Sequence, residues 1–203
     1  DSISDIKINE NPYANYTGLT KYERLGTNDQ TVITGFEELH QVYDIGAMLP
    51  TDTPYTTTTI DTEVEALEVE ISFPYGLYKI DSSGNMVDET ATYIIYYKKH
   101  SAESWTELAE KSVTGKSRTS VKSKTKIVDL DPDQYDVKVM KTSEAGGASQ
   151  SNDMRFNRLD EIKNDDLAYP NTAILGMKLL ATDQLSGSTP QVSCIVKGTK
   201  IKN

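Results

Sequence analysis

Few residues of this sequence have a type and spacing that could carry out chemistry, and the first candidate is a phosphate-binding motif. Gly115, Lys116 and Ser117 have the order that ends the glycine-rich loop of many nucleotide-binding proteins. That loop also needs a glycine five residues before Gly115, because its backbone amides must cradle the phosphate. Glu110 stands there, and its carboxylate would repel a phosphate. We therefore expect no nucleotide site.

A run of acidic residues is the second candidate, a calcium loop. Asp129, Asp131 and Asp133 have the spacing of the first three ligands of such a loop. The loop would also need a glycine at its sixth position and a glutamate at its twelfth. This chain has Gln134 and Met140 there. The sequence therefore favours a solvated turn before a strand over a weak cation site.

Histidine and cysteine, the usual metal ligands, are scarce and scattered. His40 and His100 are the only histidines, and neither is spaced with a cysteine or a second histidine as a metal site requires. His100 follows two lysines at the end of a predicted strand, so we expect it to be exposed. Cys194 is the only cysteine, which excludes an internal disulfide, and its alternation with Val192 and Val196 predicts a buried thiol.

Other catalytic patterns do not stand out. No serine has G-x-S-x-G surroundings, and no pair of carboxylates has distinguishing neighbours. The sequence therefore predicts a protein that is not an enzyme, with no catalytic residue, no metal and no cofactor.

The charge balance limits the partners. The net charge is -10 and the isoelectric point is about 4.7. Binding to nucleic acid needs a basic surface, so this composition argues against it. The one basic stretch, Lys116–Lys126, alternates its lysines with serine and threonine, which predicts the solvated face of one strand and not a phosphate-binding surface.

The composition also indicates the broad class of protein. Hydrophobic residues at 36% and a mean hydropathy of -0.52 are typical of a soluble protein. No apolar run approaches the roughly 20 residues that span a bilayer. The first residues, DSISDIKINE, have no initiator methionine and no signal-peptide pattern, so we expect a piece of a longer protein.

The stretch Leu130–Ser151 is the most informative element that could organise these residues. Tyr135, Val137 and Val139 alternate along a predicted strand and so share one face. A tyrosine at the start of such a strand resembles the tyrosine corner of Greek-key sandwiches, in which its hydroxyl bonds to nearby backbone. The pattern L-x-P-x-x-Y-x-V-x-V, followed by Gly146-Gly147, resembles the F strand and FG loop of a fibronectin type III domain.

Further strand signals surround this stretch at regular intervals and predict an all-β sandwich over residues 57–157. The alternating segment at 64–73 and the segment Ala91–Lys99 are the strongest, and Asp81–Asn85 has the composition of a hairpin turn. Trp105 begins a third strand, Thr119–Leu130 supplies a fourth, and Met154–Phe156 is expected to close the sandwich as an edge strand.

The segment before the sandwich has weaker signals. Ile3 to Ile8 predicts a short strand or an extended arm. Strands are also expected at Leu19–Leu25, Thr31–Ile33 and Gln41–Ile45. Pro50–Thr59 has two prolines and a threonine run, which predicts a linker whose last threonines could begin the next strand.

The segment after the sandwich changes character again. Leu159, Ile162 and Leu167, with Pro170 as a stop, predict a short helix or helical turn. Asn171–Ala181 is expected to be a strand, residues 181–188 a helical turn or loop, and residues 190–202 a hairpin about Gly198-Thr199. This tail is too small for a core of its own, so we expect residues 158–203 to complete a sheet with residues 1–56. The sandwich would then be an insertion in a discontinuous domain.

Several motifs in a fixed order carry a resemblance to a known family. They are Tyr22-Glu23-Arg24-Leu25-Gly26-Thr27 with Gln30, Ile33 and Gly35-Phe36; Phe73-Pro74-Tyr75-Gly76-Leu77-Tyr78; Tyr169-Pro170-Asn171-Thr172-Ala173-Ile174-Leu175-Gly176; Pro190-Gln191-Val192-Ser193; and Val196-Lys197-Gly198. Their order resembles that of the tail-tip host-specificity proteins of long-tailed bacteriophages, the J protein family of lambda-like phages. In that family, a fibronectin-like insertion interrupts the host segment.

The resemblance implies a structural protein of a phage or prophage tail tip, located in the virion and made in the bacterial cytoplasm. It implies other tail proteins as partners, a homotrimer in the full-length protein, and a bacterial receptor bound by parts outside these 203 residues. The alternative is a β-sandwich module that binds carbohydrate or protein on a phage or cell surface, since 12 tyrosines could stack on sugars. The tyrosines considered are Tyr13, Tyr16, Tyr75, Tyr78 and Tyr97, each of which could equally be a partly packed strand or loop residue.

Overall fold

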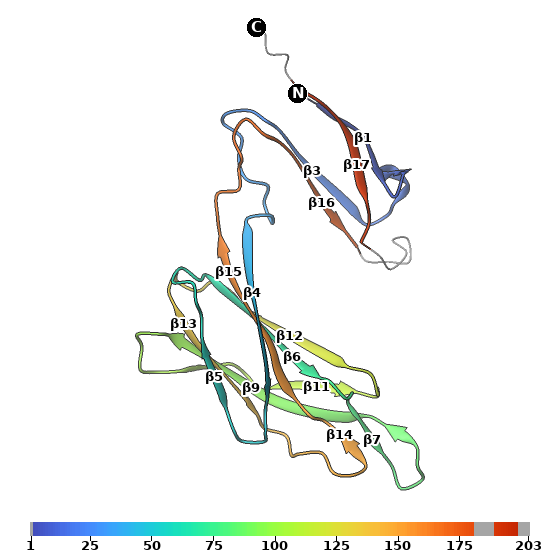
Figure 1. The fold of residues 1–203 in the computed structure, drawn as a ribbon, viewed down its shortest axis with the longest axis vertical. Helices are drawn as coiled ribbons and strands as arrows, with labels where there is room; N and C mark the ends of the chain where they lie inside the picture. Colours follow the sequence, from blue (N-terminus) through green and yellow to red (C-terminus); the bar gives the residue numbers. More distant parts are fainter. Residues whose placement is uncertain (1, 181–188, 199–203) are drawn as a thin grey trace. The chain divides into compact units, whose positions relative to one another are not determined.

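The computed structural model describes residues 2–180 and 189–198, almost all of them in β-strands or the turns between them (Figure 1). The chain divides into two compact units. The terminal unit consists of Asp1–Glu38 and Asp165–Asn203, and the sandwich unit consists of Leu39–Asn164. The all-β prediction is thus confirmed.

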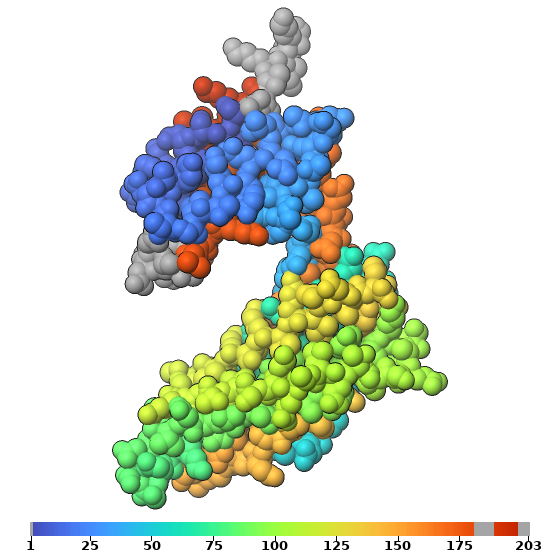
Figure 2. All heavy atoms as spheres, turned by 180° about the vertical axis from the view of Figure 1, so that it is seen from behind, coloured from blue at the N-terminus to red at the C-terminus, as the bar shows by residue number. Residues whose placement is uncertain are grey.

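The terminal unit is built from both ends of the chain, and Figure 2 shows its blue and orange-red atoms packed into one body. Its elements are β1 (Ser2–Ile8), β2 (Asn11–Pro12), η1 (Tyr13–Asn15), β3 (Leu19–Leu25), β16 (Ala173–Leu179) and β17 (Val192–Lys197). β1 pairs antiparallel with β17, and β3 pairs antiparallel with β16, with Tyr22 opposite Gly176. Both terminal segments therefore contribute strands to the same sheets.

One expected strand of the terminal unit does not form. Thr31–Ile33 is irregular: two of its carbonyls bond to a side chain, and the Ile33 carbonyl accepts from the Phe36 amide in a turn. The Arg24 guanidinium donates to Thr31 O at 2.6 Å and to Val32 O at 2.9 Å. The strand expected at Asn171–Ala181 is present as β16, whereas residues 181–188, and the hairpin beyond Gly198, lie outside the described residues.

The sandwich unit holds the remaining strands, arranged in two main sheets. They are β4 (Glu38–Met48), β5 (Tyr55–Thr58), β6 (Ala66–Phe73), β7 (Tyr78–Ile80), β8 (Met86–Val87), β9 (Glu89–Lys99), β10 (Thr106–Glu107), β11 (Lys111–Gly115), β12 (Val121–Ile127), β13 (Tyr135–Lys141), β14 (Gln150–Ser151) and β15 (Arg155–Asn164). One sheet has the order β10-β9-β13-β5, with β11 also on β9; the other has the order β12-β6-β15-β4. A small hairpin sheet, β14-β7-β8, contains the expected turn at Asp81–Asn85.

Alternating apolar residues explain why the two sheets pack. Along β13, Tyr135, Val137 and Val139 point inward and are at most 2% exposed. Val69 and Ile71 on β6 face them from the other sheet and are fully buried. Every member of the main hydrophobic cluster lies between Ile45 and Leu159, so this core belongs to the sandwich unit alone.

The structure corrects three expectations about the edges of the sandwich. The stretch expected as a linker, Pro50–Thr59, contains β5, which pairs with β13 inside the sandwich. Met154–Phe156 does not form an edge, because β15 runs between β6 and β4. Arg158–Asn164 is strand and not helix: a register shift follows Phe156, so Leu159 faces the core, whereas Ile162 lies on the opposite face.

The boundaries of the units therefore differ from those expected from the sequence. The units divide after residues 38 and 164, and not after residues 56 and 157. The reason is that β4 and the whole of β15 pair within the sandwich, which extends it in both directions.

Candidate functional site

The predicted tyrosine corner is present and occupies the acidic stretch considered as a calcium loop. Tyr135 Oη donates to Asp131 O at 2.6 Å, and burial raises the pKa of this phenol. The Lys99 ammonium lies 3.1 Å from Asp131 Oδ2 and 3.6 Å from Asp133 Oδ2. This lysine thus pairs with both carboxylates, and Asp133 Oδ1 also accepts from the Gln134 amide at 2.8 Å.

The Gly115-Lys116-Ser117 motif is part of a sheet. Gly115 ends β11, opposite Glu89 of β9. The Ser117 amide donates to Leu77 O at 3.0 Å, and the Leu77 amide donates to Ser117 O at 2.9 Å. Because this amide already has a backbone partner, it is not free to cradle a phosphate.

The second half of the basic stretch lies in β12, as predicted, with Lys122 and Lys124 on its outer face, whereas residues 116–120 precede this strand. Lys122 Nζ is 2.8 Å from Glu70 Oε1, and Lys124 Nζ is 2.6 Å from Glu68 Oε1, both across the β12–β6 pair. Burial alone would raise the pKa of Glu70, but hydrogen bonds from Lys122 and Asn157 outweigh it and hold this pKa below its ordinary value. Lys122 and Lys124 therefore neutralise glutamates of this chain.

His100 is exposed, as predicted, but it has a partner that the sequence did not suggest. Its Nδ1 lies 2.8 Å from Asp136 Oδ1, which also accepts from Thr58 Oγ1 at 2.7 Å. Lys98 Nζ lies 2.8 Å from Asp136 Oδ2. Burial opposes ionisation of Asp136, but these donors outweigh it and lower its pKa to about 2. His40 is exposed on β4.

The prediction of a buried thiol at Cys194 is wrong, because this cysteine is exposed. All six residues of β17 are exposed, including Val192, Ile195 and Val196 at about half of their surface. Alternation fixes which side chains share a face, but burial needs a second layer to cover that face.

The aromatic residues on the outer face of the β9–β13 sheet are covered by lysines. Lys138 Nζ lies 4.3 Å from the ring centre of Tyr96 and 4.4 Å from that of Trp105. Lys98 also lies over Trp105, at 5.3 Å. These rings already have a cation on a face, which leaves them less able to stack on a sugar. Of the tyrosines considered for this role, Tyr75 is exposed, whereas the other four are half-buried.

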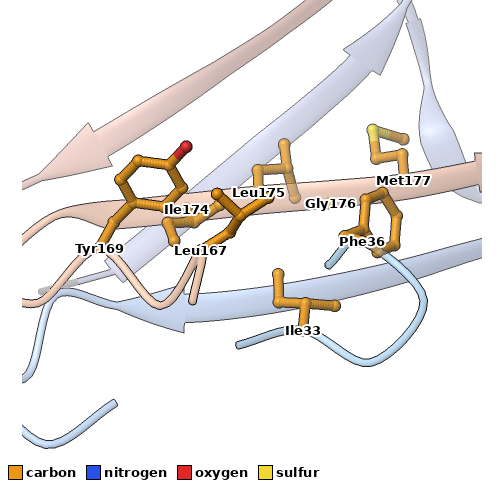
Figure 3. A pocket seen from close by; sticks show the side chains of 8 residues that line it. All are labelled: Ile33, Phe36, Leu167, Tyr169, Ile174, Leu175, Gly176 and Met177. Carbon is orange, nitrogen blue, oxygen red and sulfur yellow. The ribbon is translucent and has the colours of Figure 1, made fainter. Parts of the chain in front are cut away.

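The terminal unit has an apolar hollow of about 230 Å³ beside β16 (Figure 3). Ile33, Phe36, Leu167, Tyr169, Ile174 and Met177 are among the residues that line it. Figure 3 shows the Phe36 ring beside β16 at Gly176. A Cβ at Gly176 would lie only 3.2 Å from this ring and 3.3 Å from Ile33, so glycine lets the loop pack closely on the strand.

The Gln30 side chain connects the two segments that carry family motifs and line the hollow, residues 22–36 and 169–176. Gln30 Nε2 lies 2.7 Å from Ala168 O, 2.7 Å from Tyr169 O and 2.9 Å from Thr172 O. Its Oε1 accepts from the Gly26 amide at 2.9 Å. This side chain therefore fixes the turn that leads into β16 against the end of β3.

The described residues contain neither a metal-binding cluster nor a membrane-spanning helix. No group of three or more His, Cys, Asp or Glu side chains there is arranged to hold a metal ion. No helix in that part of the chain has the length and apolar character of a membrane-spanning segment. No sequence pattern predicted one buried polar cluster of the sandwich, which consists of Glu89, Lys141 and Asn152.

The two packed sheets and the tyrosine corner place the sandwich unit in the fibronectin type III-like class. The family model described as "Tip attachment protein J, FNIII-A domain" matches residues 41–165, more than half of the chain. The chain therefore belongs to this family, and the match nearly coincides with the sandwich unit.

Relatives cover both units of the chain. A protein of Escherichia phage SECphi4, named "Tip attachment protein J", is 28% identical over 193 residues, or 92% of this chain. A protein of Escherichia phage SECphi27 with the same name is 22% identical over 166 residues, or 79% of this chain. This chain spans 16% and 14% of the lengths of these relatives.

Proposed function

We propose that this chain is a segment of a structural protein at the tip of a phage or prophage tail, where it acts in tail assembly and host-cell attachment. The observation that carries this proposal is the family match over the sandwich unit, joined to a relative that extends over 92% of the chain. The segment has no catalytic task. The polar clusters at Lys99 and Asp136 are ion pairs made within the chain.

The two units have different tasks in this proposal. The terminal unit is part of the central hub, and the sandwich unit is an insertion that decorates it. Support comes from the pairing of β1 with β17 and of β3 with β16, which lets the chain leave the terminal unit after Glu38 and return at Asp165. An insertion of this kind can fold on its own core without disturbing its host.

The partners are other tail proteins and, in the full-length protein, two further copies in a homotrimer. The protein is made in the bacterial cytoplasm and resides in the virion. A bacterial receptor is bound by parts outside these 203 residues, since relatives are several times longer. Nucleic acid is not a partner, because the net charge of -10 repels phosphates.

Immunoelectron microscopy of intact phage tests this proposal. A short epitope tag is inserted between Ser83 and Gly84, in the exposed β7–β8 turn, within the full-length protein. We expect antibody label at the distal end of the tail, and none on untagged phage. Label on the head, along the whole tail, or only in the unassembled fraction would contradict a role at the tail tip.

A further inference from the structure

Three polar side chains point into one end of the sandwich core. Lys141 follows Tyr135, Val137 and Val139 on the inward face of β13 and is only 2% exposed. Asn152, between β14 and β15, is 1% exposed, and Glu89, at the start of β9, is 8% exposed. A lysine is almost never this deeply buried without a specific reason.

The contacts place the Asn152 carboxamide between an amine and a carboxylate. Lys141 Nζ lies 3.0 Å from Asn152 Oδ1 and 3.0 Å from Asn152 O. On its other side, Asn152 Nδ2 donates to Glu89 Oε1 at 3.2 Å and to Glu144 O at 2.9 Å. Gln150 Nε2 also donates to Glu89 Oε1, which fixes the carboxylate.

The surroundings favour a reactive form of the lysine. Burial lowers the pKa of Lys141, and the carboxylates of Asp153, Glu89 and Glu144 only partly oppose this effect. A neutral amine is a nucleophile, whereas an ammonium ion is not. Amides resist attack in water, but a fixed neighbour can raise the effective concentration of a nucleophile to about 10⁵–10⁸ M.

We propose that Lys141 and Asn152 form an intramolecular isopeptide bond, with Glu89 as the group that transfers protons. The Lys141 Nζ lone pair attacks Asn152 Cγ, and a C–N bond forms. Before the attack, a proton moves from the Lys141 ammonium to the Glu89 carboxylate. After the attack, Glu89 gives this proton to Asn152 Nδ2 and takes another from Nζ. The Cγ–Nδ2 bond breaks and ammonia leaves, so the amine and the carboxamide become one secondary amide with no oxidant or reductant.

The bond would join the two sheets covalently. Lys141 ends β13 in one sheet, and Asn152 lies in the short connection from β14 to β15, a strand of the other sheet. The cross-link would close the loop of residues 142–151 and prevent the sheets from separating at this end. This inference goes beyond the proposed function and does not depend on it.

Mass spectrometry of the purified 203-residue chain tests the bond. We expect an intact mass below the sequence mass by one molecule of ammonia, and a branched peptide that joins Lys141 to Asn152 after protease digestion. An intact mass equal to the sequence mass would overturn the proposal. So would the same mass loss with only linear peptides, because a succinimide at Asn152-Asp153 also releases ammonia.

Two variants test the role of Glu89. We expect Glu89→Gln to keep the full sequence mass, because glutamine cannot accept and return the proton. Glu144→Gln is the matched control: it removes another carboxylate that acts on Lys141, but an exposed one, so the branched peptide should still form. Circular dichroism confirms folding, and a folded Glu89→Gln protein with the branched peptide would overturn the role of Glu89.

Discussion

At the scale of single residues, two neighbours at the start of β13 serve opposite faces of their sheet. Tyr135 points into the core and bonds to the backbone of the preceding turn, whereas Asp136 points outward to Lys98, His100 and Thr58. Each side chain makes hydrogen bonds in the fold, and a buried polar group without such a bond would lower the free energy of unfolding. Both contacts should therefore be measurable as stability.

Tyr135→Phe removes the hydroxyl that bonds to Asp131 O and leaves the ring in place. We expect the free energy of unfolding to fall by about 0.5–1.5 kcal/mol, because the fold loses one hydrogen bond from a buried tyrosine. Urea denaturation measures this change. Tyr97→Phe is the control, since its ring packs near Tyr135 but the corner bond remains. Equal losses in both variants would contradict a specific role for the corner.

Asp136 predicts a dependence of stability on pH. Its pKa is about 2 in the folded chain against an ordinary 3.8, so the unfolded chain binds the proton more readily. Its contribution, about 2 kcal/mol, is therefore present above pH of about 4 and is lost as pH falls toward about 2. We expect Asp136→Asn to be less stable at neutral pH and to lose less stability on acidification. Parallel pH curves for the two proteins would refute this.

At the scale of elements, a turn without regular structure depends on the side chain of Gln30. Gln30 Nε2 donates to three carbonyls of the turn before β16, and Gln30 Oε1 accepts from the Gly26 amide after β3. The two strands of this pair are distant in sequence, and the glutamine adds side-chain hydrogen bonds to the backbone pairing that joins them. Loss of this side chain should loosen the turn.

Hydrogen exchange of Gln30→Ala tests this arrangement. We expect exchange at the Gly26 amide and in residues 168–172 to accelerate about fivefold or more, since each lost bond is worth about 1 kcal/mol. Exchange in β13, in the other unit, should not change. Gln41→Ala, at an exposed position of β4, is the control and should leave both regions unchanged. Unaltered exchange at Gly26 in Gln30→Ala would contradict the proposed role.

At the scale of the whole molecule, the two units differ in how they can fold. The main core lies within the continuous stretch Leu39–Asn164, whereas the terminal unit needs both ends of the chain. We expect residues 39–164 to fold alone with the β-sheet circular dichroism and cooperative unfolding of a sandwich. A fragment of residues 57–157 lacks β4 and most of β15 and should not unfold cooperatively. Equal behaviour of the two fragments would contradict the boundaries.

The sequence by itself determined the class of fold and one contact. Alternation at Val137 and Val139 fixed the inward face of β13, and the position of Tyr135 at a strand start predicted its bond to nearby backbone. The ordered motifs also indicated the family to which the chain belongs. These features are local, because period and turn composition depend on residues close in the chain.

Only the tertiary structure decided which strands pair and what they cover. Leu159 and Ile162 have helical spacing, but pairing with β6, almost 100 residues earlier, makes them part of a strand. Cys194 alternates like a core residue, yet no layer among the described residues covers β17. Lys141 at the end of β13 and Glu89 at the start of β9 meet Asn152, which lies in the connection between β14 and β15. Such contacts depend on partners distant in sequence, which no local pattern specifies.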